Sequence, residues 1–305
     1  MIATEKPSFI VVGPPRTGTS WLHKILAPHT VLPSPSKETR FFDLHFHRGI
    51  EWYSWHFRRR GTGPMGEIAP TYFASAEARR RIAETIPAAR IVFIFRHPIE
   101  RIVSLYRLKL AYGMLRCSFR EALLRDPELI DSGMYSTRLS GWRELFPDRQ
   151  LLVTIYDDLL SDPQAFANRI AAFIGLPGIT ISQSQLKRVY SSEQMTRPRS
   201  YLATRTAGVF ADWCKSRRLD RLVASVRESA LIHLFLGGGK SFPSISPATL
   251  HGLAEIFRPE VDALESQLGL NLENWKSAID ASVVAGPRSA DRRLQEGRAC
   301  NEAEA

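Results

Sequence analysis

Short apolar runs alternate along the chain with longer stretches in which apolar residues recur at helical spacing. The apolar runs cover residues 9–12, 91–95 and 151–155, and a further strand is expected to end within residues 67–70. Continuous runs of this kind are typical of strands buried on both faces of a parallel sheet. The pattern therefore predicts an α/β protein with its strands in the centre.

The stretches that follow these runs predict helices. Thr19 or Ser20 is expected to cap the first helix, and Pro98 to take the first position of the helix after residues 91–95. Ser161, Asp162 and Pro163 open another helix, which Gly175 closes. The apolar stripes of these three helices consist of Trp21, Leu22, Ile25, Leu26, Ile99, Ile102, Val103, Tyr106, Phe166, Ile170, Phe173 and Ile174.

The order of these elements predicts the architecture. Further helices are expected over residues 74–86 and 219–236, and from Ser246 onward with an interruption at Pro259. Repeated strand–helix units indicate three layers: a mostly parallel central sheet with helices on both faces, and ligands bound beyond the carboxyl ends of its strands. We assign residues 1–280 to one domain and residues 281–305, which lose the apolar periodicity, to a disordered tail.

The loop after residues 9–12 is a candidate anion site. Gly13, Gly18, Thr19 and Ser20 fit the frame G-x-x-x-x-G-K-[ST] of a nucleotide triphosphate loop, except that Thr19 stands where that loop has its lysine. Backbone N–H groups of such a loop converge on an anion, and Arg16 adds a positive charge. This P-loop-like turn therefore suits a nucleotide with a different terminal group, and an ordinary strand-to-helix turn is the alternative.

A second candidate anion site follows residues 91–95. A nucleoside-triphosphate enzyme usually has a magnesium-binding aspartate where such a strand ends, but this strand ends in Arg96. An arginine there binds phosphate, and the hydroxyl of Ser104 could join it on the same anion. A solvated arginine and a serine that faces water are the alternative.

Together these two segments resemble the sulfotransferases that use 3′-phosphoadenosine 5′-phosphosulfate (PAPS). In that family a loop P-[KR]-[ST]-G-T-[ST]-W/L holds the 5′-phosphosulfate, which matches residues 15–21, and an R-x-P…S element holds the 3′-phosphate, which matches Arg96 and Ser104. The resemblance is greatest to the carbohydrate-type and bacterial soluble branch, because a K-E-x-x-F-F segment follows the first helix. It covers nearly all of the chain before the tail and implies that the donor contacts are Arg16, Thr17, Gly18, Thr19, Ser20, Trp21, Arg96, Ser104 and, from a loop over the nucleotide, Arg199 or Arg197.

The resemblance also implies the catalytic residues. The family places its catalytic glutamate in the segment of Glu38, which we expect to take the proton of the acceptor. Lys37 would keep this carboxylate ionised and, with Arg16, stabilise the leaving oxygen. A surface Lys-Glu pair is the alternative. His45, His47, His56 and His97 are weaker candidates for the base, because none lies where the resemblance would place a catalytic histidine.

Two further segments bear on the acceptor. Residues 51–57 are rich in aromatic side chains that could stack on a sugar ring, and three arginines follow at residues 58–60, although core packing is as good an explanation for Trp52 and Tyr53. Several carbohydrate sulfotransferases have a lysine where this chain has Ile68. A contact that they make there is expected to be missing.

Composition narrows the choice of partner. The 305 residues carry a formal net charge of +10, which favours a polyanionic ligand, but basic runs interleaved with aromatics are lacking, so nucleic acid is not expected as a partner. Three cysteines, at positions 117, 214 and 300, have no metal-type spacing, and no metal is expected. No apolar segment has the length of a signal peptide or membrane helix, so we expect a cytoplasmic protein without a membrane anchor.

The residues thus predict an enzyme that moves a sulfuryl group from PAPS to a hydroxyl or amine of a carbohydrate or small molecule, releasing 3′-phosphoadenosine 5′-phosphate (PAP). Two alternatives stay open: a kinase of the triphosphate-loop type, which would need magnesium and a lysine, and a basic glycan- or nucleic-acid-binding protein without catalytic activity. The sequence does not identify the acceptor or the oligomeric state.

Overall fold

The computed structural model describes residues 6–58, 62–186, 206 and 242–284. Within them, four strands form a parallel sheet in the order β2-β1-β3-β4, and the strands are β1 (Phe9–Val11), β2 (Gly66–Ile68), β3 (Arg90–Phe95) and β4 (Leu151–Ile155). The α-helices are α1 (Thr19–Leu26), α2 (Gly49–Trp55), α3 (Ala76–Thr85), α4 (Pro98–Ala111), α5 (Phe119–Arg125), α6 (Glu128–Asp131), α7 (Tyr135–Arg143), α8 (Tyr156–Ser161), α9 (Pro163–Ile174), α10 (Gln183–Leu186), α14 (Pro247–Leu268) and α15 (Glu273–Val284).

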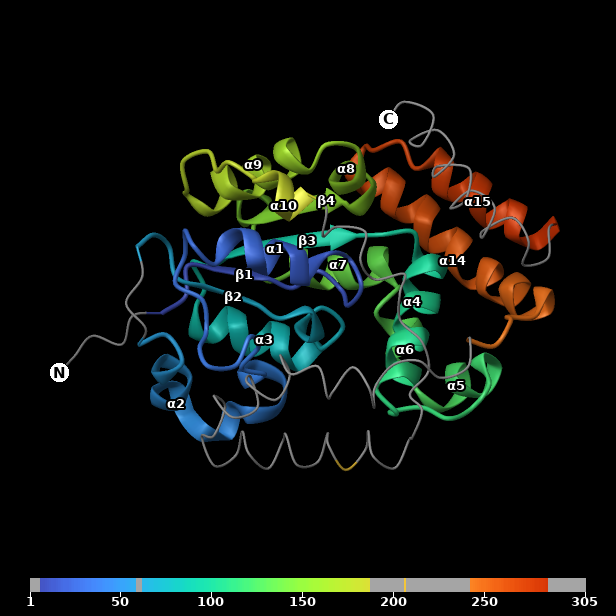
Figure 1. Cartoon of the computed structure of the whole chain (residues 1–305), viewed down its shortest axis with the longest axis horizontal. Helices are drawn as coiled ribbons and strands as arrows, with labels where there is room; N and C mark the ends of the chain where they lie inside the picture. Colours follow the sequence, from blue (N-terminus) through green and yellow to red (C-terminus); the bar gives the residue numbers. More distant parts are fainter. Residues whose placement is uncertain (1–5, 59–61, 187–205, 207–241, 285–305) are drawn as a thin grey trace.

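The predicted three-layer architecture is confirmed. Alternate residues of the central strands face opposite sides of the sheet: Ile10 belongs to one buried cluster and Val11 to the other. Helices α1 and α9 cover the face of Val11, and α3, α4, α7 and α14 cover the opposite face. Figure 1 shows the strands running between these two groups of helices. The sheet is therefore buried on both sides, as its continuous apolar strands require.

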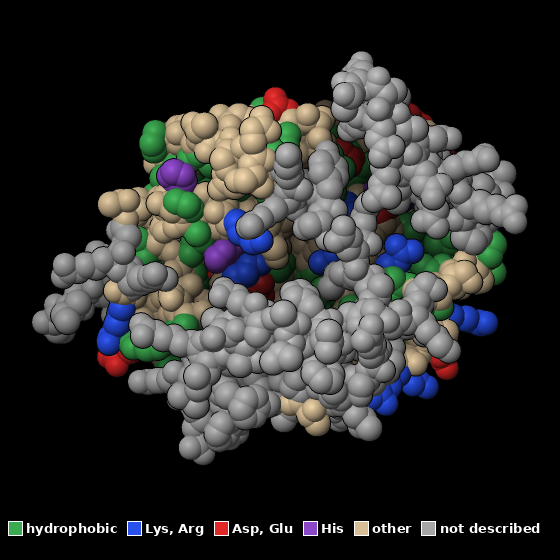
Figure 2. Space-filling view, in the orientation of Figure 1, with side chains coloured by type: hydrophobic (Ala, Val, Ile, Leu, Met, Phe, Trp, Pro, Cys, Tyr) green, Lys and Arg blue, Asp and Glu red, His purple; other side chains and the backbone are tan. Residues whose placement is uncertain are grey.

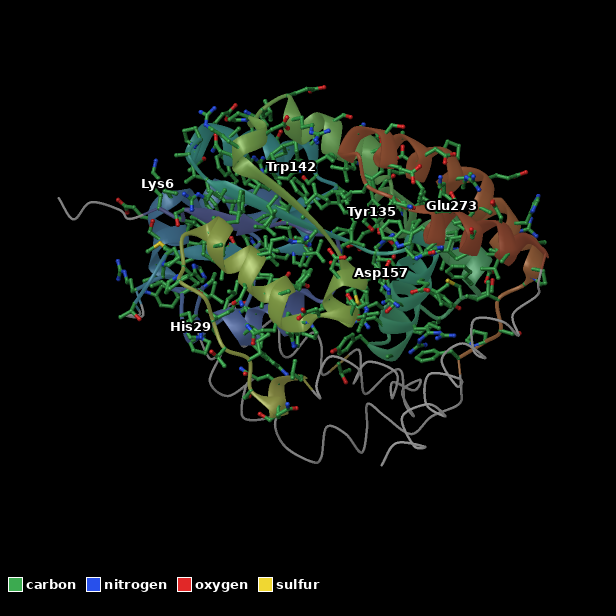
Figure 3. All side chains as sticks on the ribbon, turned by 90° about the horizontal axis from the view of Figure 1, so that it is seen from above. Lys6, His29, Tyr135, Trp142, Asp157 and Glu273 are labelled. Atoms are coloured by element: carbon green, nitrogen blue, oxygen red, sulfur yellow. The ribbon has the colours of Figure 1, made fainter. Side chains whose placement is uncertain are left out.

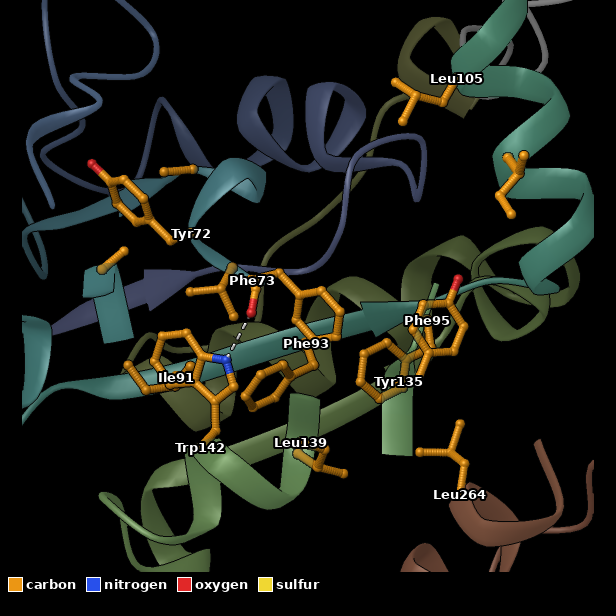
Figure 4. Close-up of a cluster of buried hydrophobic side chains, with 14 of the residues drawn as sticks. Tyr72, Phe73, Ile91, Phe93, Phe95, Leu105, Tyr135, Leu139, Trp142 and Leu264 are labelled. Carbon is orange, nitrogen blue, oxygen red and sulfur yellow. Dashed lines mark hydrogen bonds between the residues drawn. The ribbon is translucent and has the colours of Figure 1, made fainter. Parts of the chain in front are cut away.

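The larger core cluster is rich in aromatic side chains. Phe95 and Tyr135 stack with ring centroids 4.5 Å apart, and Trp142 donates its indole N–H to the Phe73 carbonyl at 3.2 Å. Figure 4 shows these rings packed along β3, with Leu264 of α14, also buried, beside them. This cluster ties the C-terminal helices to the central strand, and so to the residues that follow it.

Two details differ from the predictions, and two predictions are not tested. Helix α14 is continuous through Pro259, because Phe257 and Val261, on either side of the proline, are both buried in the same core. The predicted tail begins inside α15, which continues to Val284. The helix expected at 219–236 lies outside the described residues, and the assignment of residues 1–280 to one domain stays a prediction.

Candidate functional site

The loop between β1 and α1 is pressed tightly onto its neighbours. A Cβ atom at Gly13 would lie 2.7 Å from the backbone nitrogen of Ile94 in β3. Gly18 has a φ of +86°, and a Cβ there would lie 2.7 Å from the side chain of Leu159 in α8. Both glycines are thus required by the path of the loop, because a side chain would push it away from the sheet.

Helix α1 begins at a different residue from the one expected. Gly18, and not Thr19 or Ser20, is its N-cap, and no side chain caps the helix. The first helical hydrogen bond runs from Leu22 N–H to the Gly18 carbonyl at 3.0 Å. The N–H groups of Thr19, Ser20 and Trp21 precede that bond and have no acceptor within the helix, which is the arrangement that binds an anion at a helix N-terminus.

Thr17 and Trp21, two of the predicted contacts to the nucleotide, use their side chains to hold the protein structure. The buried Thr17 hydroxyl donates to the Pro14 carbonyl at 2.8 Å and holds the loop closed. Trp21 is also buried: its indole N–H donates to the Gln185 carbonyl at 3.3 Å, and its ring lies 6.2 Å from that of Phe166. The indole of Trp21 is thus occupied by the protein, and the backbone N–H is the donor that Trp21 can offer to an anion.

Arg16 connects the loop to helix α4. Its backbone is left-handed, with a φ of +76°, which is uncommon for a residue other than glycine and frequent at functional sites. Its guanidinium Nε donates to the Ser104 hydroxyl at 2.9 Å. Burial, and then the charge of Arg96, lowers the pKa of Arg16 from its ordinary value. A buried cation next to a second cation is stabilised by an anion placed between them.

Arg96 extends from the end of β3 toward the same loop. Its guanidinium lies 3.5 Å from the Arg16 carbonyl, forms an ion pair with Glu100 at 3.0 Å, and sits 4.9 Å above the ring of Tyr156. The hydroxyl of Tyr135 donates to the Arg96 carbonyl at 2.7 Å and fixes its backbone. The structure therefore brings the two predicted anion sites together, at the ends of adjacent strands.

Lys37 and Glu38 lie against this loop. The Lys37 ammonium donates to the Ser20 hydroxyl at 3.2 Å and lies 3.5 Å from the Glu38 carboxylate. About a third of the Lys37 side chain and a quarter of the Glu38 side chain are exposed (31% and 27%), so both can reach a bound molecule. Burial raises the pKa of Glu38, opposed by the charge of Lys37, and burial lowers the pKa of Lys37.

The remaining predictions have mixed outcomes. Arg197 and Arg199 lie outside the described residues. The imidazole of His97 caps α4 and accepts from Glu100 N–H at 3.4 Å. Among the aromatics of residues 51–57, Tyr53 is in the core and stacks on Phe41 at 4.6 Å, whereas Trp52, partly buried, carries the guanidinium of Arg48 at 5.0 Å.

Tyr156 is part of the site and was not predicted from the sequence. Its ring lies under the guanidinium of Arg96, and a Cβ atom at Gly18 would be 3.3 Å from the same ring. A signal was available, because Tyr156 directly follows the apolar run of β4 and so falls at the carboxyl edge of the sheet. Ile68, by contrast, is completely buried between β1 and α1 and contributes packing alone.

The surface around these residues is basic. Figure 2 shows Lys and Arg side chains along the middle of one face, in the region where Figure 1 places α1 and α4. Among the described residues, no three His, Cys, Asp or Glu side chains are grouped so that they could hold a metal ion. No helix in the described part of the chain is both long enough and apolar enough to cross a membrane.

Comparison with known proteins gives consistent relatives. Residues 6–216 match the sulfotransferase domain family. The chain is 32% identical over 194 residues to the bifunctional heparan sulfate N-deacetylase/N-sulfotransferase 2 of Bos taurus, an alignment that covers 56% of this chain and 22% of that protein. It is 30% identical over 185 residues to the heparan sulfate glucosamine 3-O-sulfotransferase 3B1 of Mus musculus, covering 57% of this chain and 47% of that protein.

A solved structure shares the fold. The sulfotransferase from Alicyclobacillus acidocaldarius superposes with a TM-score of 0.63 at 19% identity, and the superposition covers 89% of this chain and 99% of the other. The chain spans less than half of the length of the two curated relatives described above, so their complete activities do not transfer to it as a whole.

Proposed function

The chain belongs to the sulfotransferase domain family, and from this premise we propose that it transfers a sulfuryl group from PAPS to a hydroxyl or amine of a carbohydrate or small molecule. The observation that carries the proposal is the contact between Arg96 and the Arg16 carbonyl, at 3.5 Å. It sets two cations at the tips of neighbouring strands, where a nucleotide with phosphate groups at both ends can span them.

The residues fit such a donor. The free N–H groups at the start of α1, together with Arg16, suit its 5′-phosphosulfate. Arg96, whose guanidinium lies over the ring of Tyr156, suits the 3′-phosphate, together with Ser104 of α4, which accepts a hydrogen bond from Arg16. The donor supplies an activated sulfuryl group, and the protein supplies alignment and charge.

The catalytic step needs a base and a cation. The Glu38 carboxylate takes the proton of the acceptor O–H or N–H as the new bond to sulfur forms. The bond from sulfur to the bridging oxygen breaks, and Lys37 and Arg16 neutralise the charge that develops on the departing phosphate. Glu38 and Lys37 are 3.5 Å apart and Lys37 contacts Ser20, so base and cation are held next to the loop.

The acceptor class is supported by the relatives, two of which are named for heparan sulfate. A glucosamine-containing glycan is therefore the first acceptor to test. The three widely spaced cysteines support a reducing compartment such as the cytoplasm as the place of action.

The test is transfer from ³⁵S-labelled PAPS to a panel that contains N-desulfated heparin and p-nitrophenol. We expect label in at least one acceptor, with release of PAP and without added magnesium. Activity that depends on ATP and magnesium would instead support a kinase. Salt-sensitive glycan binding without any turnover would support a binding protein.

A further inference from the structure

Glu67 is a completely buried carboxylate within the sheet. It lies in β2, opposite Ile10 of the neighbouring strand β1, and its side chain is not exposed at all. An isolated carboxylate in such a place is costly, so its partners must satisfy it. None of the steps proposed above uses it.

Four donors surround its two oxygens. Thr39 donates to Oε1 twice, from its backbone N–H at 2.6 Å and from its hydroxyl at 2.8 Å. The hydroxyls of Tyr53 and Tyr72 donate to Oε2 at 3.0 and 3.3 Å. This set of donors matches an ionised carboxylate, which has about four acceptor positions and no proton to give.

Two of these hydroxyls also accept hydrogen bonds from backbone N–H groups. The N–H of Phe41 donates to the Thr39 hydroxyl at 3.1 Å, and the N–H of Phe42 donates to the Tyr72 hydroxyl at 3.4 Å. Three backbone N–H groups of residues 39–42 are thus linked to the Glu67 carboxylate. Thr39 N–H donates to it directly, and Phe41 and Phe42 are linked to it through one hydroxyl each. Arg40 lies in the middle of this turn with a left-handed φ of +53°, a conformation that the surrounding bonds hold in place.

In the sequence, Glu38 directly precedes residues 39–42, and through Lys37 it is linked to the loop before α1, which we call the donor loop. On one side Lys37 contacts Ser20, and on the other side Thr39 is bound to Glu67. We propose that Glu67 is a positioning residue, which fixes the backbone of the catalytic segment so that Glu38 points at the acceptor. The inference rests on the proposed function of Glu38. A shift of the base by about 1 Å is enough to reduce a rate on the order of 100-fold.

The protonation of Glu67 gives this role a pH dependence. Burial raises the pKa of Glu67 to about 7, opposed by the hydrogen bonds from Thr39 and Tyr53, and the charge of Glu38 raises it further. Other titratable or charged groups also face Glu67 and Glu38. The hydroxyls of Tyr53 and Tyr72 face Glu67, Lys37 and Arg40 lie beside Glu38, and Asp43 lies near Tyr72. A protonated Glu67 cannot accept all four bonds, so the segment loosens as the pH falls through the pKa of Glu67.

The test compares Glu67→Gln and Thr39→Val with wild type. Turnover is read as release of PAP from PAPS in the presence of N-desulfated heparin, and donor binding as the dissociation constant of PAP. We expect kcat to fall about 10- to 100-fold in Glu67→Gln and about 10-fold in Thr39→Val. PAP affinity should stay within about twofold of wild type in both, because Glu67 does not touch the donor site.

The pH profile separates positioning from mere stability. The acidic limb of kcat should move to lower pH in Glu67→Gln, because the titrating group is gone and a negative charge near Glu38 is removed. Thr154→Val is the matched control. The buried hydroxyl of Thr154, in β4, donates to the Phe93 carbonyl in β3 at 2.8 Å. Loss of this hydroxyl should leave kcat within about twofold of wild type.

The outcomes are distinct. Should Glu67→Gln not fold, Thr39→Val keeps the carboxylate and still tests the link. Wild-type kcat and an unshifted limb would overturn the inference, as would a loss of PAP affinity in parallel with turnover. If wild type itself neither binds PAP nor cleaves PAPS, the proposed function has failed, and not the role of Glu67.

Discussion

At the scale of single residues, the site combines cations that hold a donor with one carboxylate placed to accept a proton. Arg16 belongs to the loop before α1 and contacts Ser104 of α4, whereas Arg96 contacts that loop and Lys37 contacts the first turn of α1. Glu38 contacts Lys37. This separation of tasks means that binding and turnover should respond to different substitutions.

Glu38→Gln should remove turnover and leave donor binding nearly unchanged. The amide keeps the size of the side chain but cannot take a proton, so we expect kcat to fall by roughly 100-fold or more. The dissociation constant of PAP, measured by calorimetry, should change less than about twofold. A variant with full activity would show that another group is the base.

Arg96→Ala should weaken PAP binding specifically through the 3′-phosphate. A charge-assisted contact of this kind contributes roughly 1.5–3 kcal/mol, or about 10- to 100-fold in affinity. The affinity for adenosine 5′-phosphate, which lacks that phosphate, should change little. Arg80→Ala is the control, because that arginine is exposed and pairs with Glu77 and Glu84 of its own helix. Equal losses for both nucleotides would contradict the assignment.

At the scale of elements, the positions of the strands and of α1, α4 and α9 could be predicted, because buried parallel strands and amphipathic helices leave clear periodic patterns. Arg16, Arg96 and Lys37 were predicted from their place at strand ends or from the resemblance. Tyr156 and Glu67 were not, because their partners lie far away in the sequence: Tyr156 meets Arg96, and Glu67 meets Thr39 and Tyr53.

The donor loop should tolerate no side chain at Gly18. Gly18→Ala would force a left-handed backbone on alanine, at about 1–2 kcal/mol, and would press on Leu159 of α8. We expect a lower melting temperature, by about 2–4 °C for each kcal/mol, and weaker PAP binding. Gly252→Ala, in α14 with open space around it, should instead be neutral or stabilising, by roughly 0.5–1 kcal/mol. A stable Gly18→Ala protein with normal affinity would contradict the tight-loop explanation.

At the scale of the whole molecule, the C-terminal helices support the site from outside. The indole N–H of Trp275 in α15 donates to the Asp157 carboxylate at 2.6 Å, directly after Tyr156. Figure 3 shows Asp157 and Tyr135 next to these helices. Residues that form or support the donor site thus come from both ends of the described chain, which is why no single segment of sequence contains them all.

PAP should stabilise the whole molecule in a salt-dependent way. A ligand at about 100 times its dissociation constant adds roughly 2.7 kcal/mol, or about 5–10 °C in melting temperature for a protein of this size. Raising sodium chloride from about 50 to 500 mM should reduce this shift, because the phosphates meet partly exposed cations. A shift that does not depend on salt would indicate a site dominated by apolar contacts.

The adjacency of β1 and β3 has a consequence for how this enzyme can change over evolutionary time. Hydrogen-bonded strands keep a spacing of about 4.8 Å, so the pairing of β1 with β3 fixes the distance between the sites for the two ends of the nucleotide. Substitutions in segments that contact the acceptor do not change this distance. The choice of acceptor can therefore change while the distance between the two anion sites stays the same.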